Sequence, residues 1–260
     1  MLRRSRLLVP ALAVTAALLA GCSGGSSSAS GPRVGGSAVS SDEAKVLAEL
    51  LHKDYQQGGG DFTETAPFAE GAVITLTGTI DWTAPAGHAQ AVTTYTNGQA
   101  GETRDVFFTD KEIWFGGVPG LPEALTAAGQ PPATYIKRPL AVTRSDGSPN
   151  LTDVLAQLLL NLSARKSDDP RAFQQAGYTW RGQRSINGKL ASEYTLSGGA
   201  RVSVAAENKM LMQYVTPLPG QTFDVTITVP THGHRTVDLP AANQTVDASA
   251  HQDVAAAVGV

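Results

Sequence analysis

Apolar and polar residues alternate with a period of two from Ala72 to Trp82, which restricts this segment to a β-strand with one apolar face. Turn-forming residues follow at 85–87, 97–98 and 109–111. The segments between them, 92–96, 106–109 and 113–115, are expected to be strands. The pattern therefore predicts an antiparallel meander of about four strands.

A second set of strands is expected between Tyr178 and Val215. Turn signals at 187–188, 198–199 and 208–209 fall about ten residues apart, and Asn187-Gly188 is the strongest hairpin signal among them. Residues 223–229 alternate again and are expected to form the last strand. The two meanders show no sequence repeat.

Helical spacing occurs in three places. Apolar residues recur from Val46 to Tyr55, after an acidic start at 41–43 and before a stop at 58–60. Residues 151–162 are apolar on more than one side and are expected to form a buried helix. A short helix is expected after Asp169-Pro170.

The Gly/Pro-rich residues 116–134 are expected to form an ordered excursion or lid. The strands and helices together predict an α+β fold class, with one large antiparallel sheet and helices to cover its apolar face.

The N-terminus has the pattern of a secretory signal. Three arginines within residues 3–6 precede an apolar run, 7–19, that is too short to span a bilayer. Leu19-Ala20-Gly21-Cys22 resembles a bacterial lipobox, so residues 1–21 are expected to be a signal peptide removed before a diacylated Cys22. This places the protein on the extracytoplasmic face of the cell membrane, anchored by lipid. The alternative is an ordinary secretory signal that leaves Cys22 as a free thiol.

Composition divides the rest of the chain. The Ser/Gly-rich residues 22–41 are expected to be a flexible tether, 42–250 the folded domain and 251–260 a tail. Cys22 is the only cysteine, so the domain must hold by its core without disulfides.

The charge balance excludes two classes of partner. The full chain has 20 basic and 23 acidic residues, and removal of three arginines with the signal leaves 17 against 23. This acidic balance argues against nucleic acid and against a polybasic membrane contact, so covalent lipid must supply the attachment.

No set of residues with catalytic spacing is present. The strand acids Asp81, Asp105, Glu193 and Asp224 lack a paired spacing, and no nucleophile elbow or phosphate-binding loop occurs. His232-Gly233-His234 is the one metal-like pair, and no cysteine or nearby acid completes it. We therefore expect neither an enzyme nor a metal or cofactor site.

The second half of the chain resembles the actinobacterial LppX/LprG-type lipoproteins. The residues that carry this resemblance are Asp169-Pro170, Gly177, Gly182, Ile186-Asn187-Gly188 and Tyr194, with Val154-Leu155-Ala156 before them and Val237-Asp238-Leu239-Pro240 after them. The resemblance covers most of 42–247 and is specific only in this half. Residues 116–134 depart from the family's pattern, so the resemblance does not predict the cavity entrance.

The resemblance implies a LolA-like fold, in which a curved antiparallel sheet forms an incomplete barrel covered by helices. It also implies a hydrophobic cavity for an acyl lipid or glycolipid, and a transporter or acceptor protein of the envelope as partner. The inward positions expected to line this cavity are Ile74, Leu76, Ile80, Trp82, Leu155, Leu158, Leu159, Val225 and Ile227.

Strand alternation cannot distinguish a lined cavity from a filled core, so both remain open for these residues. The alternative function is a ligand-free surface module whose sheet binds another envelope protein.

Overall fold

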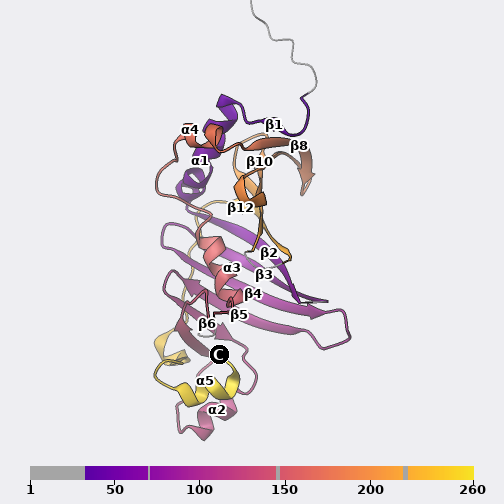
Figure 1. Ribbon diagram of the computed structural model, residues 1–260. Coiled ribbons are helices and arrows are strands. Elements are labelled where there is room, and N and C mark those ends of the chain that lie inside the picture. Colours follow the sequence, from indigo (N-terminus) through magenta and orange to yellow (C-terminus); the bar gives the residue numbers. More distant parts are fainter. Residues whose placement is uncertain (1–32, 70, 145–146, 219–221) are drawn as a thin grey trace, which may run out of the picture. The chain divides into compact units, whose positions relative to one another are not determined.

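The computed structural model describes residues 33–69, 71–144, 147–218 and 222–260. The signal peptide, Cys22 and most of the expected tether lie outside these residues. Within them, strands and helices combine into an α+β fold with one large curved, unclosed sheet, as predicted (Figure 1).

Thirteen strands of the described residues form this sheet, in the order β1-β8-β9-β10-β11-β12-β2-β3-β4-β5-β6-β7-β13. Neighbours pair antiparallel, except β13, which runs parallel to β7. The strands are β1 (Ser37–Ala38), β2 (Gly59–Ala69), β3 (Ala72–Asp81), β4 (Ala86–Tyr95), β5 (Glu102–Thr109), β6 (Glu112–Gly116), β7 (Tyr135–Pro139), β8 (Thr179–Ile186), β9 (Lys189–Thr195), β10 (Arg201–Ala205), β11 (Leu211–Pro217), β12 (Asp224–His232) and β13 (Thr245–Asp247).

Both predicted meanders are present, and the first is longer than expected. It runs over six strands, β2 to β7, because β2 and β7 extend the four that alternation predicted. The second runs from β8 to β12. Pairing of β12 with β2 joins the two meanders into one sheet. The expectation that β12 is the last strand is wrong, because β13 follows it and pairs with β7.

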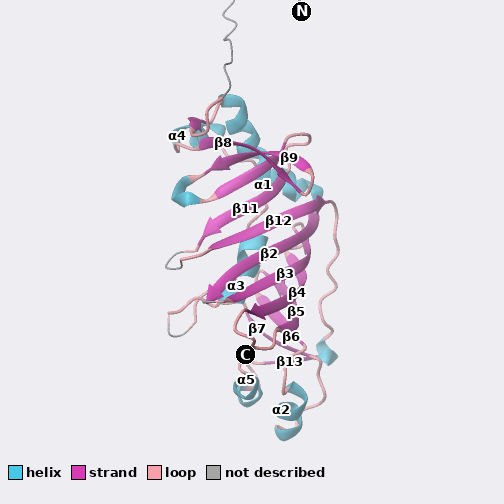
Figure 2. Ribbon diagram, turned by 90° about the vertical axis from the view of Figure 1, so that its right-hand side faces the viewer, coloured by secondary structure: helices cyan, strands magenta, loops and turns pink. Residues whose placement is uncertain are grey.

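The helices α1 (Ser41–Gln57), α3 (Leu151–Leu160) and α4 (Pro170–Gln175) confirm the three helical predictions. A capping box between Ser40 and Glu43 starts α1, and Gly58 ends it in the left-handed conformation, φ +87°. Asp169 caps α4 through the backbone amide of Arg171. In both ribbon views α3 lies across β2, β3 and β4 (Figures 1 and 2).

Two segments have structure where the sequence predicted none. Residues Ser37–Ala38, within the expected tether, form β1 and pair with β8. The expected tail contains α5 (Gln252–Val258), which packs against α2 (Leu121–Ala127) of the excursion 116–134. The apolar side chains of these two helices, Leu121, Leu125 and Val254, are buried.

The larger of two hydrophobic clusters in the described residues lies between the helices and the inner face of the sheet. It joins side chains from α1, α3 and the strands of both meanders, including Leu47, Leu76, Leu155 and Ile227. We call the sheet face that carries these side chains the inner face. Within the described residues, none of the helices combines the length and the apolar character needed to cross a membrane.

Candidate functional site: cavities along helix α3

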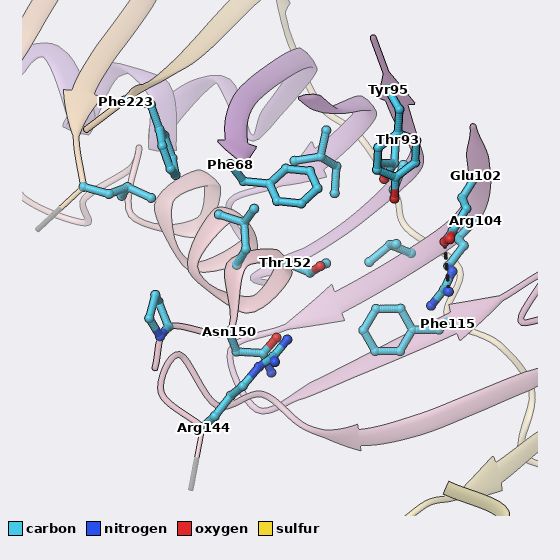
Figure 3. Close-up of a pocket in the computed structure, with 16 residues that line it drawn as sticks. Phe68, Thr93, Tyr95, Glu102, Arg104, Phe115, Arg144, Asn150, Thr152 and Phe223 are labelled. Atoms are coloured by element: carbon cyan, nitrogen blue, oxygen red, sulfur yellow. Dashed lines mark hydrogen bonds and ion pairs between the residues drawn. The ribbon is translucent and has the colours of Figure 1, made fainter. Parts of the chain in front are cut away.

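A cavity of about 410 Å³, which we call cavity A, lies between the N-terminal end of α3 and the inner face of the first meander. Apolar side chains from β2 to β6 form part of its wall: Phe68, Ile74, Ala91, Val106 and Phe115. Leu151 and Thr152 of the first turn of α3 also line the cavity, together with Leu218 and Phe223 from the connection between β11 and β12. Figure 3 shows Thr152 and Phe223 among these side chains.

The remainder of the cavity A lining is polar and carries a surplus of positive charge. Arg104 is paired with Glu102, with 3.1 Å between Nη2 and Oε2. Arg144 lies on another side of the cavity, and its guanidinium has no ion pair or hydrogen bond with any residue of the described ranges (Figure 3). Two guanidinium groups therefore face one carboxylate, which favours an anionic group at this cavity.

Two smaller cavities continue along α3. Cavity B, about 300 Å³, is lined by Val142, Thr143, Pro149, Val154, Gln157, Leu158 and Leu218. Cavity C, about 320 Å³, is lined by Leu47, Leu50, Leu51, Leu158, Asn161, Leu162, Asp168, Phe173, Tyr178, Leu196, Val202, Leu211 and Tyr214. Pro149 and Leu218 border both A and B, and Leu158 borders both B and C. The three cavities therefore adjoin one another from the N-terminal to the C-terminal end of the helix.

Polar contacts hold α3 at both of its ends. At the N-terminal end, the buried Asp153 carboxylate accepts two hydrogen bonds from Arg138 of β7, at 2.7 and 2.8 Å, and one from the Ala141 amide at 2.6 Å. The Arg138 guanidinium also lies 5.2 Å from the ring centroid of Phe115. At the other end, Trp82 Nε1 donates to the Leu159 carbonyl at 3.3 Å. These contacts set the height of the helix above the sheet and thereby the size of the cavities.

The structure distributes the nine predicted cavity residues between cavity walls and core. Ile74 lines cavity A, and Leu158 lines cavities B and C. The other seven lie in the filled core and line none of these cavities: Leu76, Ile80, Trp82, Leu155, Leu159, Val225 and Ile227. Cys22 lies outside the described residues.

Sequence reasoning missed the aromatic and charged lining. Phe68 belongs to β2, a strand that was not predicted, and Phe223 and Leu218 flank a connection between strands. Arg104 sits on the predicted meander, but only the pairing of β5 with β4 and the position of α3 make it a cavity residue. The period-two pattern Phe62, Glu64, Ala66, Phe68 was the signal that could have revealed β2.

Two of the buried carboxyl groups, Asp54 and Glu64, have a raised pKa. Asp54 of α1 is 0% exposed, and its Oδ1 lies 3.3 Å from Nε2 of His232. Burial raises the pKa of Asp54 to about 6, although the His232 imidazole acts in the opposite direction. Glu64 of β2 is also 0% exposed, and burial raises its pKa well above the usual range.

The Asp54 carboxyl should make folding stability fall as pH rises. The pKa of Asp54 is about 6 in the folded protein and 3.8 in the unfolded chain. Between these two pH values, the carboxyl group binds more protons in the folded state than in the unfolded state. This proton binding stabilises the folded state by about 3 kcal/mol below about pH 4, and the stabilisation is lost as pH rises through about 6.

Urea unfolding across this range should show the loss in the wild type and not in Asp54→Asn. His232→Gln should show a larger loss, because the imidazole lowers the pKa of Asp54. Parallel curves for wild type and Asp54→Asn would contradict this assignment.

His232 and His234 do not come together with other described side chains in a metal-binding cluster. His232 contacts Asp54, whereas His234 is exposed. In the described part of the chain, no group of three or more His, Cys, Asp and Glu side chains is placed to hold a metal ion.

Solved structures resemble this chain in part. The crystal structure of LprF from Mycobacterium bovis has a TM-score of 0.45 and 11% identity, covering 78% of this chain and 98% of LprF. An uncharacterized conserved protein from Thermus thermophilus has a TM-score of 0.37 and 10% identity, covering 79% of this chain and 99% of that protein. MucB has a TM-score of 0.37 and 14% identity, covering 79% of this chain and 62% of MucB. No family model and no curated protein matches the sequence.

Proposed function

We propose that this protein is a lipid-anchored lipoprotein of the cell envelope that binds an acylated lipid along α3 and carries or presents it. The observation that carries the proposal is the series of adjoining cavities A, B and C between α3 and the inner face of an unclosed sheet. Each has the volume of a small-molecule site, which is about 300–1,000 Å³. Their mainly apolar walls suit acyl chains, which gain about 25 cal/mol for each Å² removed from water.

The polar part of cavity A gives the bound lipid an orientation. Arg144, Arg104 and Asn150 line cavity A, whereas the described linings of cavities B and C contain no arginine or lysine. A lipid therefore places its head group at cavity A and its acyl chains along α3. In this proposal the residues that line the cavities bind the lipid and do not react with it.

The N-terminal sequence supports attachment to a membrane. Val34 follows the lipobox cysteine, Cys22, by twelve residues, a length that reaches at most about 40 Å when fully extended. A diacylated Cys22 would keep the domain within this distance of the bilayer. The carrier would then exchange lipid with its own membrane or with an acceptor protein within reach, as the LppX/LprG resemblance implies.

Lipid extraction and native mass spectrometry test the proposed function. We would purify the full chain with Cys22→Ser, so that covalent acyl groups do not contribute, and extract it with organic solvent. A stoichiometric acyl lipid, also seen as a mass increment on the native protein, is the expected result. A homogeneous ligand-free protein that takes up neither added phospholipid nor added glycolipid contradicts the carrier and favours the protein-binding module.

Arg144→Glu should reduce the affinity for an anionic lipid and leave a neutral lipid unaffected. The substitution reverses a charge at cavity A that has no ion-pair partner among the described residues, and a charge-assisted hydrogen bond contributes about 1.5–3 kcal/mol. We expect about a tenfold loss for phosphatidylglycerol and no change for diacylglycerol, measured by competition with a fluorescent lipid. Arg165→Glu is the matched control, because Arg165 is exposed, lines none of the three cavities and changes net charge equally. An equal effect of both variants would show that only net charge matters.

A further inference from the structure

Glu64 is a fully buried carboxyl group that has no hydrogen-bonding partner among the described residues. Both of its carboxyl oxygens are inaccessible to solvent and contact no donor within the described residues. The residues directly opposite on the neighbouring strands are Leu76 of β3 and Ile227 of β12, both apolar and buried. Buried polar groups in proteins are nearly always paired, and an unpaired one is costly. The position therefore requires an explanation that packing does not supply.

Strand register places Glu64 between cavities A and C. Residues directly opposite one another in antiparallel strands point to the same face of the sheet. One such row crosses the inner face in the order Val202, Tyr214, Ile227, Glu64, Leu76, Ala91, Arg104. Its first two residues line cavity C, and its last two line cavity A. Glu64 is two strands from Tyr214 and two from Ala91, about 10 Å from each at the usual strand spacing.

Helix α3 crosses β2, β3 and β4 on the inner face of the sheet, and part of its apolar side chains are buried there (Figures 1 and 2). Leu155 and Leu159 are buried in the same core cluster as Leu76 and Ile227. The polar contacts that tie the helix to the sheet are made by the Asp153 carboxylate and the Leu159 backbone carbonyl, and Leu155 lies between these two points. Moving the two leucines outward would join cavities A and C into one space that passes Glu64.

We propose that Glu64 is a ligand-binding residue: a diacyl lipid displaces Leu155 and Leu159, joins cavities A and C, and places an ester linkage against the Glu64 carboxyl group. This inference rests on the proposed lipid-carrier function and adds to it the class of lipid and the residue that recognises it. One acyl chain enters cavity C, and the head group remains with Arg104 and Arg144 at cavity A.

The chemistry of the carboxyl group matches an ester. Burial in apolar surroundings raises the pKa of Glu64 well above its usual range, which favours the neutral acid, and the O–H of a neutral acid can donate to a carbonyl oxygen. Among the described residues this donor has no partner, whereas an ester carbonyl would supply one. The hydrogen bond is therefore formed only in the complex, so its full effect appears in the affinity. A dialkyl ether lipid has no carbonyl oxygen and loses this contact.

A pair of lipids that differ only in this linkage tests the inference. We would compare diacyl phosphatidylglycerol with its dialkyl ether analogue of equal chain length, using the full chain with Cys22→Ser. The wild type should bind the ester about tenfold more tightly than the ether.

Three variants test the role of the carboxyl group. Glu64→Gln should keep the preference for the ester because its amide also donates. Glu64→Leu should bind both lipids equally and should have a higher Tm, since it removes the unpartnered polar group. Leu76→Met is the matched control, because it alters packing beside Glu64 without changing a polar group, and it should keep the preference.

The outcomes separate this inference from the proposed function. Equal affinity of the wild type for ester and ether, or a Glu64→Leu variant that still prefers the ester, overturns the role of Glu64 and leaves the carrier function standing. Failure of the wild type to bind either lipid overturns the carrier function itself. The wild-type comparison needs no substitution at Glu64, so it decides the question even if the leucine variant does not fold.

Discussion

Replacing Arg138 with methionine should lower the free energy of unfolding by about 3–5 kcal/mol, because it leaves a buried charge without its partner. Asp153 is 0% exposed, and Arg138 meets both of its carboxylate oxygens in a two-pronged contact. Methionine retains much of the packing against Phe115 but donates no hydrogen bond. Urea unfolding followed by tryptophan fluorescence measures the change, since Trp82 contacts the other end of α3.

Two further variants separate the ion pair from general effects. Arg138→Met combined with Asp153→Leu should recover most of the lost stability, because the buried charge is then absent. Lys45→Met removes an exposed ion pair with Asp42 and should cost less than about 1 kcal/mol. If Arg138→Met is no more destabilising than Lys45→Met, the Asp153 contact does not hold α3 in place.

Local signals in the sequence were enough to predict much of the fold. The start of α1 at Ser40 and its end at Gly58 depend on side chains and backbone conformations within a few residues. The hairpin between β8 and β9 is likewise set by Asn187 and Gly188, both of which have positive φ. Such features need no distant partner, and they appear where the sequence predicts them.

Strands that depend on distant partners were missed. In β2 the inward position 64 is a glutamate, which interrupts the apolar alternation of Phe62, Ala66 and Phe68 and hides the strand. β1 has only two residues, and β13 has three. β1 forms a strand because it pairs with the edge strand β8, and β13 because it pairs with β7. A two- or three-residue segment has no pattern of its own that predicts such pairing.

The cavity could be predicted only in part, for a related reason. Alternation identifies inward side chains such as Leu76 and Ile74, but both point to the same face. Whether each is covered depends on where α3 begins and how closely it lies above the sheet. Leu76 is fully buried in the core, whereas Ile74, two residues before it in β3, lines cavity A.

Leu158→Trp should reduce lipid uptake at least tenfold while the domain remains folded. Leu158 is half-buried and borders both cavity B and cavity C, so an indole can occupy space that the acyl chain would otherwise fill. Because this space is empty in the free protein, the larger side chain displaces few packed atoms, and the free energy of unfolding should change by less than about 1 kcal/mol. Native mass spectrometry with added phosphatidylglycerol measures the uptake, and urea unfolding measures the stability.

Leu155→Trp makes the same change in size at a position of opposite character. Leu155 is 0% exposed, lies in the core and lines none of the three cavities. The extra volume there must force packed side chains apart, which costs about 1–3 kcal/mol or more. The two substitutions on one helix therefore separate filling a cavity from overpacking a core. A folded Leu158→Trp protein with unchanged uptake would place the lipid somewhere other than along α3, and a strongly destabilised one would mean that cavities B and C are closed in solution.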